Sequence, residues 1–252
     1  MAKMTLEELV AQLVTAYDST LVSVVLYGSA ASGEHVPDRS DYNVLVIVRE
    51  LPMARLRAVA AVARAWAEAG NPAPLTLTAA EWRASADIFP MEYADILERH
   101  RVLHGEMPIE GITVSPADLR LQVEHQAMGK LLQLRQGVLA AGADGKRQLS
   151  LLADSLSTIM VVFRGVVRLH GAKPPGGHEA LSQEVGRRAG FDAEPFVRVA
   201  RHVRGEEALT PAAAGDVLSG YLAGVQTLVS HLDRFSPGAD RGPGLSRLPT
   251  QD

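Results

Sequence analysis

The sequence predicts an α+β protein, in which a small N-terminal α/β domain is followed by an all-α helical bundle. Short apolar, β-branched segments alternate with helical ones up to about residue 105, whereas only helical patterns follow residue 115. Hydrophobic residues make up 47% of the 252-residue chain and aromatic residues only 5%, so the core must consist mostly of Leu, Val and Ala. We assign residues 1–110 to the α/β domain, 111–235 to the helical bundle and 236–252 to a disordered, Gly- and Pro-rich tail.

The α/β domain begins with a helix signal. Thr5 and Glu8 have the T-x-x-E spacing of a capping box, which predicts a helix to about residue 18. Apolar strands are predicted over 21–27 and 42–48, and the Gly- and Pro-containing segment between them has the composition of a loop. The remaining predicted elements are a helix over 52–69, a strand over 75–78, a helix over 92–98 and a strand over 101–103.

Two cap-plus-proline signals organise the helical bundle. Ser115 followed by Pro116 predicts a long helix to about residue 141, and Thr210 followed by Pro211 predicts another to about residue 234. The helix predicted over 149–170 is apolar almost all round, so we expect it to be buried within its own bundle or against a partner, and a homodimer is possible. Two shorter helices are predicted over 179–189 and 194–204.

The composition excludes several classes of function. The chain has no cysteine, which rules out disulfides, a cysteine nucleophile and a thiolate zinc site. The net charge of −4 provides no global basic field, so nucleic acid is not an expected partner. No stretch approaches about 18 uninterrupted apolar residues, and the N-terminus has no long apolar run. We therefore expect a cytoplasmic protein without a membrane segment.

The segment LYGSAASGEHVPDRSDYNVLVIV, residues 26–48, carries the chemistry. Gly28 permits close backbone approach and a positive φ, and Ser29 adds a hydroxyl and an N–H where a short helix could begin, which suits a phosphate. Asp41 and Asn43 lie two apart on a predicted strand, so their side chains share one face. Two oxygen-bearing side chains beside a phosphate loop make half of a magnesium site.

This segment resembles the signature of the DNA polymerase β-type nucleotidyltransferase superfamily. The domain order resembles the aminoglycoside nucleotidyltransferases and small bacterial nucleotidyltransferases with HEPN-like helical partners. The resemblance implies a small mixed sheet and transfer of a nucleoside monophosphate, with ATP as the expected donor, to a hydroxyl of a small molecule or protein. It also implies that Gly28 and Ser29 hold the triphosphate, that Asp41 is catalytic as a magnesium ligand, and that Asn43 occupies the position of the second ligand.

Two departures from this pattern leave the activity open. Asn43 brings no negative charge, and the strand over 75–78, where a third carboxylate is expected, offers only Thr76 and Thr78. The nearest acids, Glu81 and Asp87, lie beyond that strand, and their spacing gives them no clear role. The alternative to an active nucleotidyltransferase is a catalytically impaired nucleotide-binding protein with a regulatory or partner-binding, antitoxin-like role.

Other charged residues are weaker candidates. Lys130 lies on the first long helix of the bundle and could meet nucleotide phosphates in an interdomain cleft. Arg164 and His170 have the R-x5-H spacing that resembles HEPN ribonucleases, a pattern that also arises easily by chance. Acids and histidines between residues 92 and 104 lack metal-ligand spacing, and we interpret them as a solvated helix face. That group comprises Glu92, Asp95, Glu98, His100 and His104.

Overall fold

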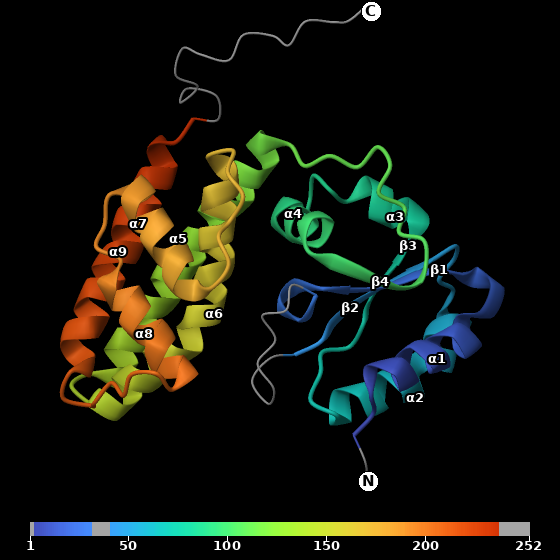
Figure 1. Ribbon diagram of the computed structural model, residues 1–252, viewed down its shortest axis with the longest axis horizontal. Coiled ribbons are helices and arrows are strands. Elements are labelled where there is room, and N and C mark those ends of the chain that lie inside the picture. The colour runs from blue at the N-terminus through green and yellow to red at the C-terminus, as the bar shows by residue number, and fades with distance from the viewer. Residues whose placement is uncertain (1–2, 32–40, 237–252) are drawn as a thin grey trace, which may run out of the picture. The chain divides into compact units, whose positions relative to one another are not determined.

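The computed structural model of the chain describes residues 3–31 and 41–236 (Figure 1). The chain divides into two compact units, Met1–Ser115 and Pro116–Asp252. The first unit holds a sheet with helices on both faces and the second is helical, so the predicted α+β class is confirmed. Apart from Ser236, the predicted disordered tail lies outside the described residues.

The sheet of the first unit is mixed and has four strands in the order β3-β2-β1-β4. β1 pairs antiparallel with both β2 and β4, whereas β2 and β3 are parallel. The parallel pair is joined through helix α2, as a crossover between parallel strands requires. The strands are β1 (Leu21–Tyr27), β2 (Asn43–Val48), β3 (Leu75–Thr78) and β4 (His100–Gly105).

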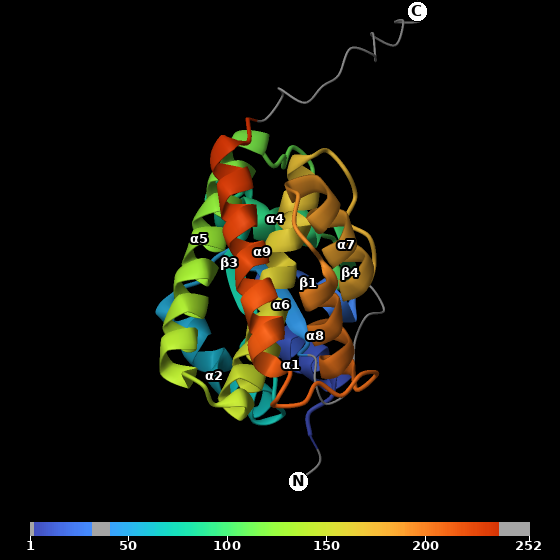
Figure 2. The same ribbon diagram turned by 90° about the vertical axis from the view of Figure 1, so that its left-hand side faces the viewer.

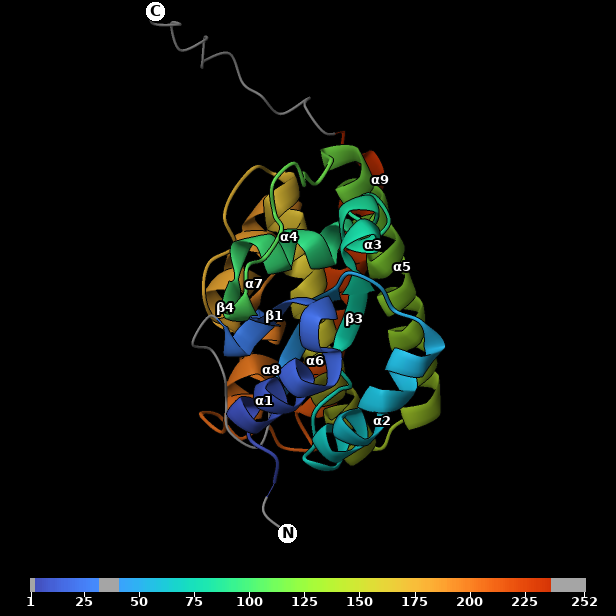
Figure 3. The same cartoon turned by 90° about the vertical axis from the view of Figure 1, so that its right-hand side faces the viewer.

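Helices cover both faces of this sheet (Figures 1 and 3). Successive residues of β2 point to opposite faces, so Val46 packs in a cluster with Trp66 of α2, and Ile47 packs in another with Trp82 of α3. β2 is therefore buried on both sides, which explains its continuous apolar run. The helices of this unit are α1 (Leu6–Tyr17), α2 (Met53–Glu68), α3 (Ala79–Ala84) and α4 (Pro90–Glu98), with short 3-10 turns at η1 (Asp18–Thr20) and η2 (Gly28–Ala30).

Helix α3 is absent from the predicted elements, although its signal is present. The Thr78 hydroxyl accepts from the Glu81 N–H at 3.1 Å, and the Glu81 carboxylate accepts from the Thr78 N–H at 2.7 Å. This is a second capping box, with the same spacing as the box of Thr5 and Glu8 that opens α1. The segment was missed because it is only six residues long and follows a strand directly.

The second unit contains three long helices that lie side by side (Figure 2), α5, α6 and α9. α6 packs against all four other helices, as its apolar composition predicts. Its length and composition would also suit a membrane span, but half of its most apolar window is buried inside the protein, as in a core helix. The helices are α5 (Pro116–Ala141), α6 (Gly145–Leu169), α7 (His178–Ala189), α8 (Glu194–Arg204) and α9 (Ala214–Arg234).

The last helix begins later than its cap signal predicts. Residues 211–213 form a turn in which the Ala213 N–H donates to the Thr210 carbonyl at 3.0 Å, and α9 begins at Ala214. That turn lays the Pro211 carbonyl against Gly145, where a Cβ would come within 2.1 Å of it. The proline therefore serves the packing of the turn onto the start of α6 and does not occupy the first position of a helix.

Candidate functional site

The candidate site lies where β1 ends and β2 and β4 begin. Tyr27, the last residue of β1, pairs with Asn43 on one side and with His100 on the other. Because both pairings are antiparallel, the end of β1 and the starts of β2 and β4 share one edge of the sheet. Gly28 follows with φ +76°, and a Cβ there would lie 3.4 Å from Asn43 Nδ2. The fold thus brings Gly28 and Asn43 together.

The backbone turns sharply after Gly28. Gly28, Ser29 and Ala30 form a 3-10 turn in which the Ala31 N–H donates to the Gly28 carbonyl at 3.1 Å. A short helical turn therefore does begin at this point, as the sequence allowed, and among the described residues it is 3-10 and not α-helical. Residues 32–40 of the predicted phosphate loop lie outside the described residues.

The strand alternation separates Tyr42 from its two polar neighbours. Tyr42 packs against Trp66, with 6.1 Å between ring centroids, and its N–H donates to Asn71 Oδ1 at 3.1 Å. Asp41 is exposed and Asn43 half-buried. Because alternate residues of a strand share a face, Asn43 belongs to the face that α3 and α4 cover.

Strand β3 does not supply a third acid, and its threonines face away from Asn43. Thr76 pairs with Val46, whose side chain lies on the α1 and α2 face, and Thr76 hydrogen-bonds with Tyr17 of α1. Glu81 caps α3, and its bonds to Thr78 lower the pKa of its carboxyl below the usual range. The spacing of Glu81 gives it no clear role at the site, and the capping box accounts for this residue.

Two acids of α4 act electrostatically on the site edge. Burial raises the pKa of the Tyr27 hydroxyl above its usual range, and the nearby carboxylates of Glu92 and Asp95 raise it further. Asp95 is half-buried and accepts two bonds from Arg99, at 2.7 and 3.0 Å, whereas Glu92 is exposed. The exposure of Glu92 agrees with the predicted solvated face, whereas the effect of both acids on the pKa of Tyr27 was not predicted.

The sequence contains a local signal that indicates where Glu92 and Asp95 lie relative to the sheet edge. Only Arg99 separates the end of α4 from β4, so the helix and the strand must meet at one edge. His100 then pairs with Tyr27, and its Nδ1 lies 2.8 Å from the Ile96 carbonyl, which can only accept. Nδ1 therefore carries the proton. A helix that runs directly into a strand beside Tyr27 brings its last two turns to the edge where Gly28 lies.

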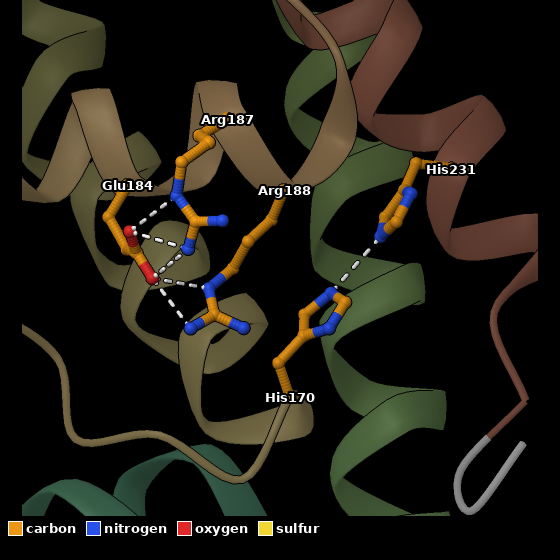
Figure 4. Close-up of polar contacts among 5 residues, drawn as sticks. All are labelled: His170, Glu184, Arg187, Arg188 and His231. Atoms are coloured by element: carbon orange, nitrogen blue, oxygen red, sulfur yellow. Dashed lines mark hydrogen bonds and ion pairs between the residues drawn. The ribbon is translucent and has the colours of Figure 1, made fainter. Parts of the chain in front are cut away.

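The candidate residues of the helical unit have local partners. The Lys130 ammonium on α5 donates to Gln133 Oε1 at 3.1 Å. His170 caps the end of α6, and its Nε2 lies 3.2 Å from Nε2 of His231 on α9 (Figure 4). One of these two nitrogens must carry a proton that the other accepts. His170, the histidine of the R-x5-H pattern, therefore belongs to a histidine pair between the ends of α6 and α9.

Figure 4 also shows the ion pairs of α7. Glu184 accepts from Arg187 at 2.9 Å and from Arg188 at 2.6 Å. Burial raises the pKa of the Glu184 carboxyl, but the bonds from the two arginines outweigh it and leave the pKa below its usual range. These arginines therefore serve an acid of their own helix.

The acids at the sheet edge do not form a metal cluster by themselves. Across residues 3–31 and 41–236, no group of three or more His, Asp or Glu side chains could hold a metal ion. Asp41 and Asn43 offer one carboxylate and one amide oxygen. A cation at this edge would need further oxygen ligands from a bound substrate.

Comparisons with known proteins identify the fold. No protein-family model and no curated protein matches the sequence. Among solved structures, the chain is similar to the crystal structure of spectinomycin adenyltransferase AAD(9) from Enterococcus faecialis with ATP and spectinomycin. The TM-score is 0.57 at 12% sequence identity, and the match covers 90% of this chain and 98% of that chain. The HEPN-like character of the helical unit stays a prediction, but the chain has the fold of a nucleotidyltransferase.

Proposed function

We propose that this protein binds a nucleoside triphosphate, with ATP as the first candidate, at the sheet edge formed by Gly28, Asp41 and Asn43. The observation that carries the proposal is the pairing of Tyr27 with Asn43, which sets a buried, positive-φ glycine against a polar side chain. A glycine in that place lets phosphate oxygens approach the backbone closely. The structure of AAD(9), which shares this fold, contains ATP and spectinomycin.

The donor atoms at this edge suit magnesium that arrives with the nucleotide. Asp41 is an exposed carboxylate two residues before Asn43, which opens β2 and adds an amide oxygen. Both are hard oxygen donors, and magnesium usually keeps substrate phosphates in its coordination shell. Asp41 and Asn43 would hold the ion, which would neutralise charge on the phosphates when bound. Ser29 follows Gly28 and would contribute to triphosphate binding.

We also propose Glu92 as the acid that completes the site. Its charge acts on Tyr27 from α4, and its side chain is exposed, whereas Asp95 is half-buried. In the proposed reaction the acceptor hydroxyl loses its proton to the Glu92 carboxylate while its oxygen bonds to the α-phosphorus. The bond from that phosphorus to the bridging oxygen of the β-phosphate breaks, and pyrophosphate leaves. The acceptor is a hydroxyl compound or a protein side chain.

Calorimetric titration with ATP and magnesium tests the binding proposal. We expect the parent chain to bind, and Asp41→Ala and Ser29→Ala to weaken binding by at least tenfold. Asp87→Ala is the matched control, because Asp87 is an exposed acid in the turn before α4. No binding by the parent chain, or equal binding by all four proteins, would refute the proposal.

Transfer is tested separately, with ATP labelled in the α-phosphate and a panel of aminocyclitols, aminoglycosides and proteins. We expect label on an acceptor, lost in Asp41→Ala and reduced at least a hundredfold in Glu92→Gln. Glu98→Gln, on the same helix, should transfer label normally. If Glu92→Gln and Glu98→Gln behave alike, Glu92 is not the base.

Asn43 favours a second candidate function, nucleotide binding without turnover. One carboxylate and one amide are a weak set for holding two cations, and two-metal sites rely on several anionic ligands. In this case the chain would act as a regulatory or partner-binding, antitoxin-like protein that responds to nucleotide. Asn43→Asp should then raise magnesium affinity without creating transfer. Label transfer by the parent chain would eliminate this candidate.

A further inference from the structure

Helix α5 carries a line of exposed apolar side chains that we call the α5 stripe. The spacings along the stripe are seven, four and seven residues, so all four members lie within about 20° of one line along the helix and span about 27 Å. The buried residues Val123 and Leu134 lie on the opposite side of α5 from this line. The members and their exposed fractions are Leu121 (67%), Met128 (44%), Leu132 (49%) and Leu139 (84%).

The stripe is symmetric about its own centre. Leu121 and Leu139 lie nine residues on either side of Lys130, and Met128 and Leu132 lie two residues on either side. An antiparallel copy of the helix therefore places Leu121 opposite the partner's Leu139 and Met128 opposite the partner's Leu132. A two-fold axis requires this self-complementarity, in which residue i meets residue j and j meets i.

We propose that the α5 stripe is the interface of a two-fold homodimer in which two α5 helices pack antiparallel. The occupant of the stripe is thus a second copy of this chain. The proposal does not depend on nucleotide binding, since no stripe residue belongs to the candidate site.

The charges beside the stripe are complementary in the same arrangement. Glu124 and Arg135 both lie about 40–60° to the same side of the line. In an antiparallel pair related by a two-fold axis, this side of one helix faces the same side of the other helix. The midpoint between Glu124 and Arg135 falls within one residue of the centre of the stripe. Each Arg135 then lies opposite the partner's Glu124, which gives two ion pairs. Within its own helix Glu124 already accepts from Arg120 at 3.0 Å. In the dimer, Glu124 would therefore lie between two guanidinium groups, that of Arg120 and that of the partner's Arg135.

The area fits a modest dimer. Four large apolar side chains with these exposures offer roughly 400 Å² per copy, and the flanking polar residues along about 27 Å of helix can add a similar area. A stable interface typically buries about 800 Å² per partner. We therefore expect a dimer that dissociates in the micromolar range, at the lower end of stable interfaces.

Sedimentation velocity over a concentration series tests the proposal, with two adjacent substitutions as a matched pair. Leu139→Glu places a charge in the stripe, whereas Ala140→Glu places the same charge about 100° around the helix. Both positions are exposed, so the monomer should keep its fold. We expect Leu139→Glu to raise the dissociation constant at least a hundredfold and Ala140→Glu to leave it within threefold. A parent chain that stays monomeric up to about 100 µM, roughly a hundredfold above a 1 µM dissociation constant, or equal effects of the two substitutions, overturns the proposal.

Cysteine cross-linking tests the antiparallel arrangement, and the absence of native cysteines leaves no background. A mixture of Leu121→Cys and Leu139→Cys proteins should form a disulfide-linked pair on mild oxidation, because these positions face each other. Leu121→Cys alone should not, because the two copies of residue 121 are about 27 Å apart and disulfides need Cα atoms within about 7 Å. Linkage of Leu121→Cys to itself would show a parallel pair and overturn the arrangement.

Discussion

On one face of the sheet, α1 and α2 close over the strands, and Tyr17 and Trp66 of these helices are each 1% exposed. On the other face, α3 and α4 cover Leu45, but the strand ends Tyr27 and Asn43 stay half-buried. The same strands build both faces, and alternation sends neighbouring residues to opposite sides. The first face is a closed apolar core. The second face has polar groups at its strand ends, and the candidate site lies at these ends, where the helices bury the strands less completely.

The largest expected change in stability comes from removing a tryptophan from either face, and it tests the difference between the two faces. Trp66→Ala and Trp82→Ala should each destabilise the chain by about 3–5 kcal/mol, because both side chains are fully buried. Trp82 also donates to the Pro108 carbonyl at 2.9 Å and stacks on Tyr93 with 4.2 Å between ring centroids. Urea unfolding gives the two free energies of unfolding.

Backbone amide shifts separate the two tryptophan variants. In Trp82→Ala the disturbance should spread through α4 and reach the amides of Tyr27 and Asn43, since this tryptophan supports the helix beside the site. In Trp66→Ala it should centre on α1, α2 and Tyr42, which packs against this tryptophan. Equal disturbance of Tyr27 in both variants would contradict the separation of the two faces.

Tyr93 connects α4 to α3 and gives the next largest effect. Its hydroxyl donates to the Trp82 carbonyl at 2.6 Å, so Tyr93→Phe leaves a buried acceptor unsatisfied and should cost about 1–3 kcal/mol. Burial raises the pKa of Tyr93 to about 12. The unfolded chain loses this proton near pH 10 and the folded chain keeps it, so the stability from this group is full below pH 10 and is lost as pH rises to about 12. Tyr93→Phe should flatten the fall in unfolding free energy across this window, and an unchanged slope would contradict the assignment.

Much of the fold follows from local sequence signals. β1 and β3 are predicted with the bounds that they have, and so is α5, because apolar runs and a Ser-Pro cap are local features. The strand order, and hence the face that each residue occupies, depends on pairings between distant residues. Thr76 illustrates this: the strand was predicted correctly, but the parallel pairing with Val46 turns its side chain toward Tyr17 and away from Asn43. Spacing predicts Asp41 and Asn43 as candidate site residues, whereas Glu92, which we propose from the structure, comes from a different element and no spacing links it to them.

The two capping boxes give a smaller, matched test of the two faces. Thr5→Ala opens the box of α1, which has twelve residues, and Thr78→Ala opens the box of α3, which has six. Each should cost about 1 kcal/mol. The loss at Thr78 should also speed amide exchange through all of α3, because this helix has fewer than two full turns to hold it together. Hydrogen exchange measures this. Fraying of α1 to the same extent would contradict the reasoning.

The smallest expected effect is the most direct test of the site face. If Glu92 lies beside Tyr27, then Glu92→Gln removes a negative charge that raises the pKa of the Tyr27 hydroxyl, and that pKa should fall. Titration by NMR with ring-labelled tyrosine follows this proton, and Tyr27→Phe identifies its signal. The measurement requires neither nucleotide nor activity, so it tests the geometry separately from the proposed chemistry.

Glu98→Gln is the control for that titration, because Glu98 lies on the same helix but is not among the acids that raise the pKa of Tyr27. Both substitutions remove one charge from α4, so a general change in the field of the helix would move Tyr27 equally in the two variants. A shift in Glu92→Gln alone would mean that the acid and the strand end share one site. Equal shifts, or none, would remove Glu92 from the edge and leave Asp41 as the one acid of the predicted set on which the chemistry of this face could depend.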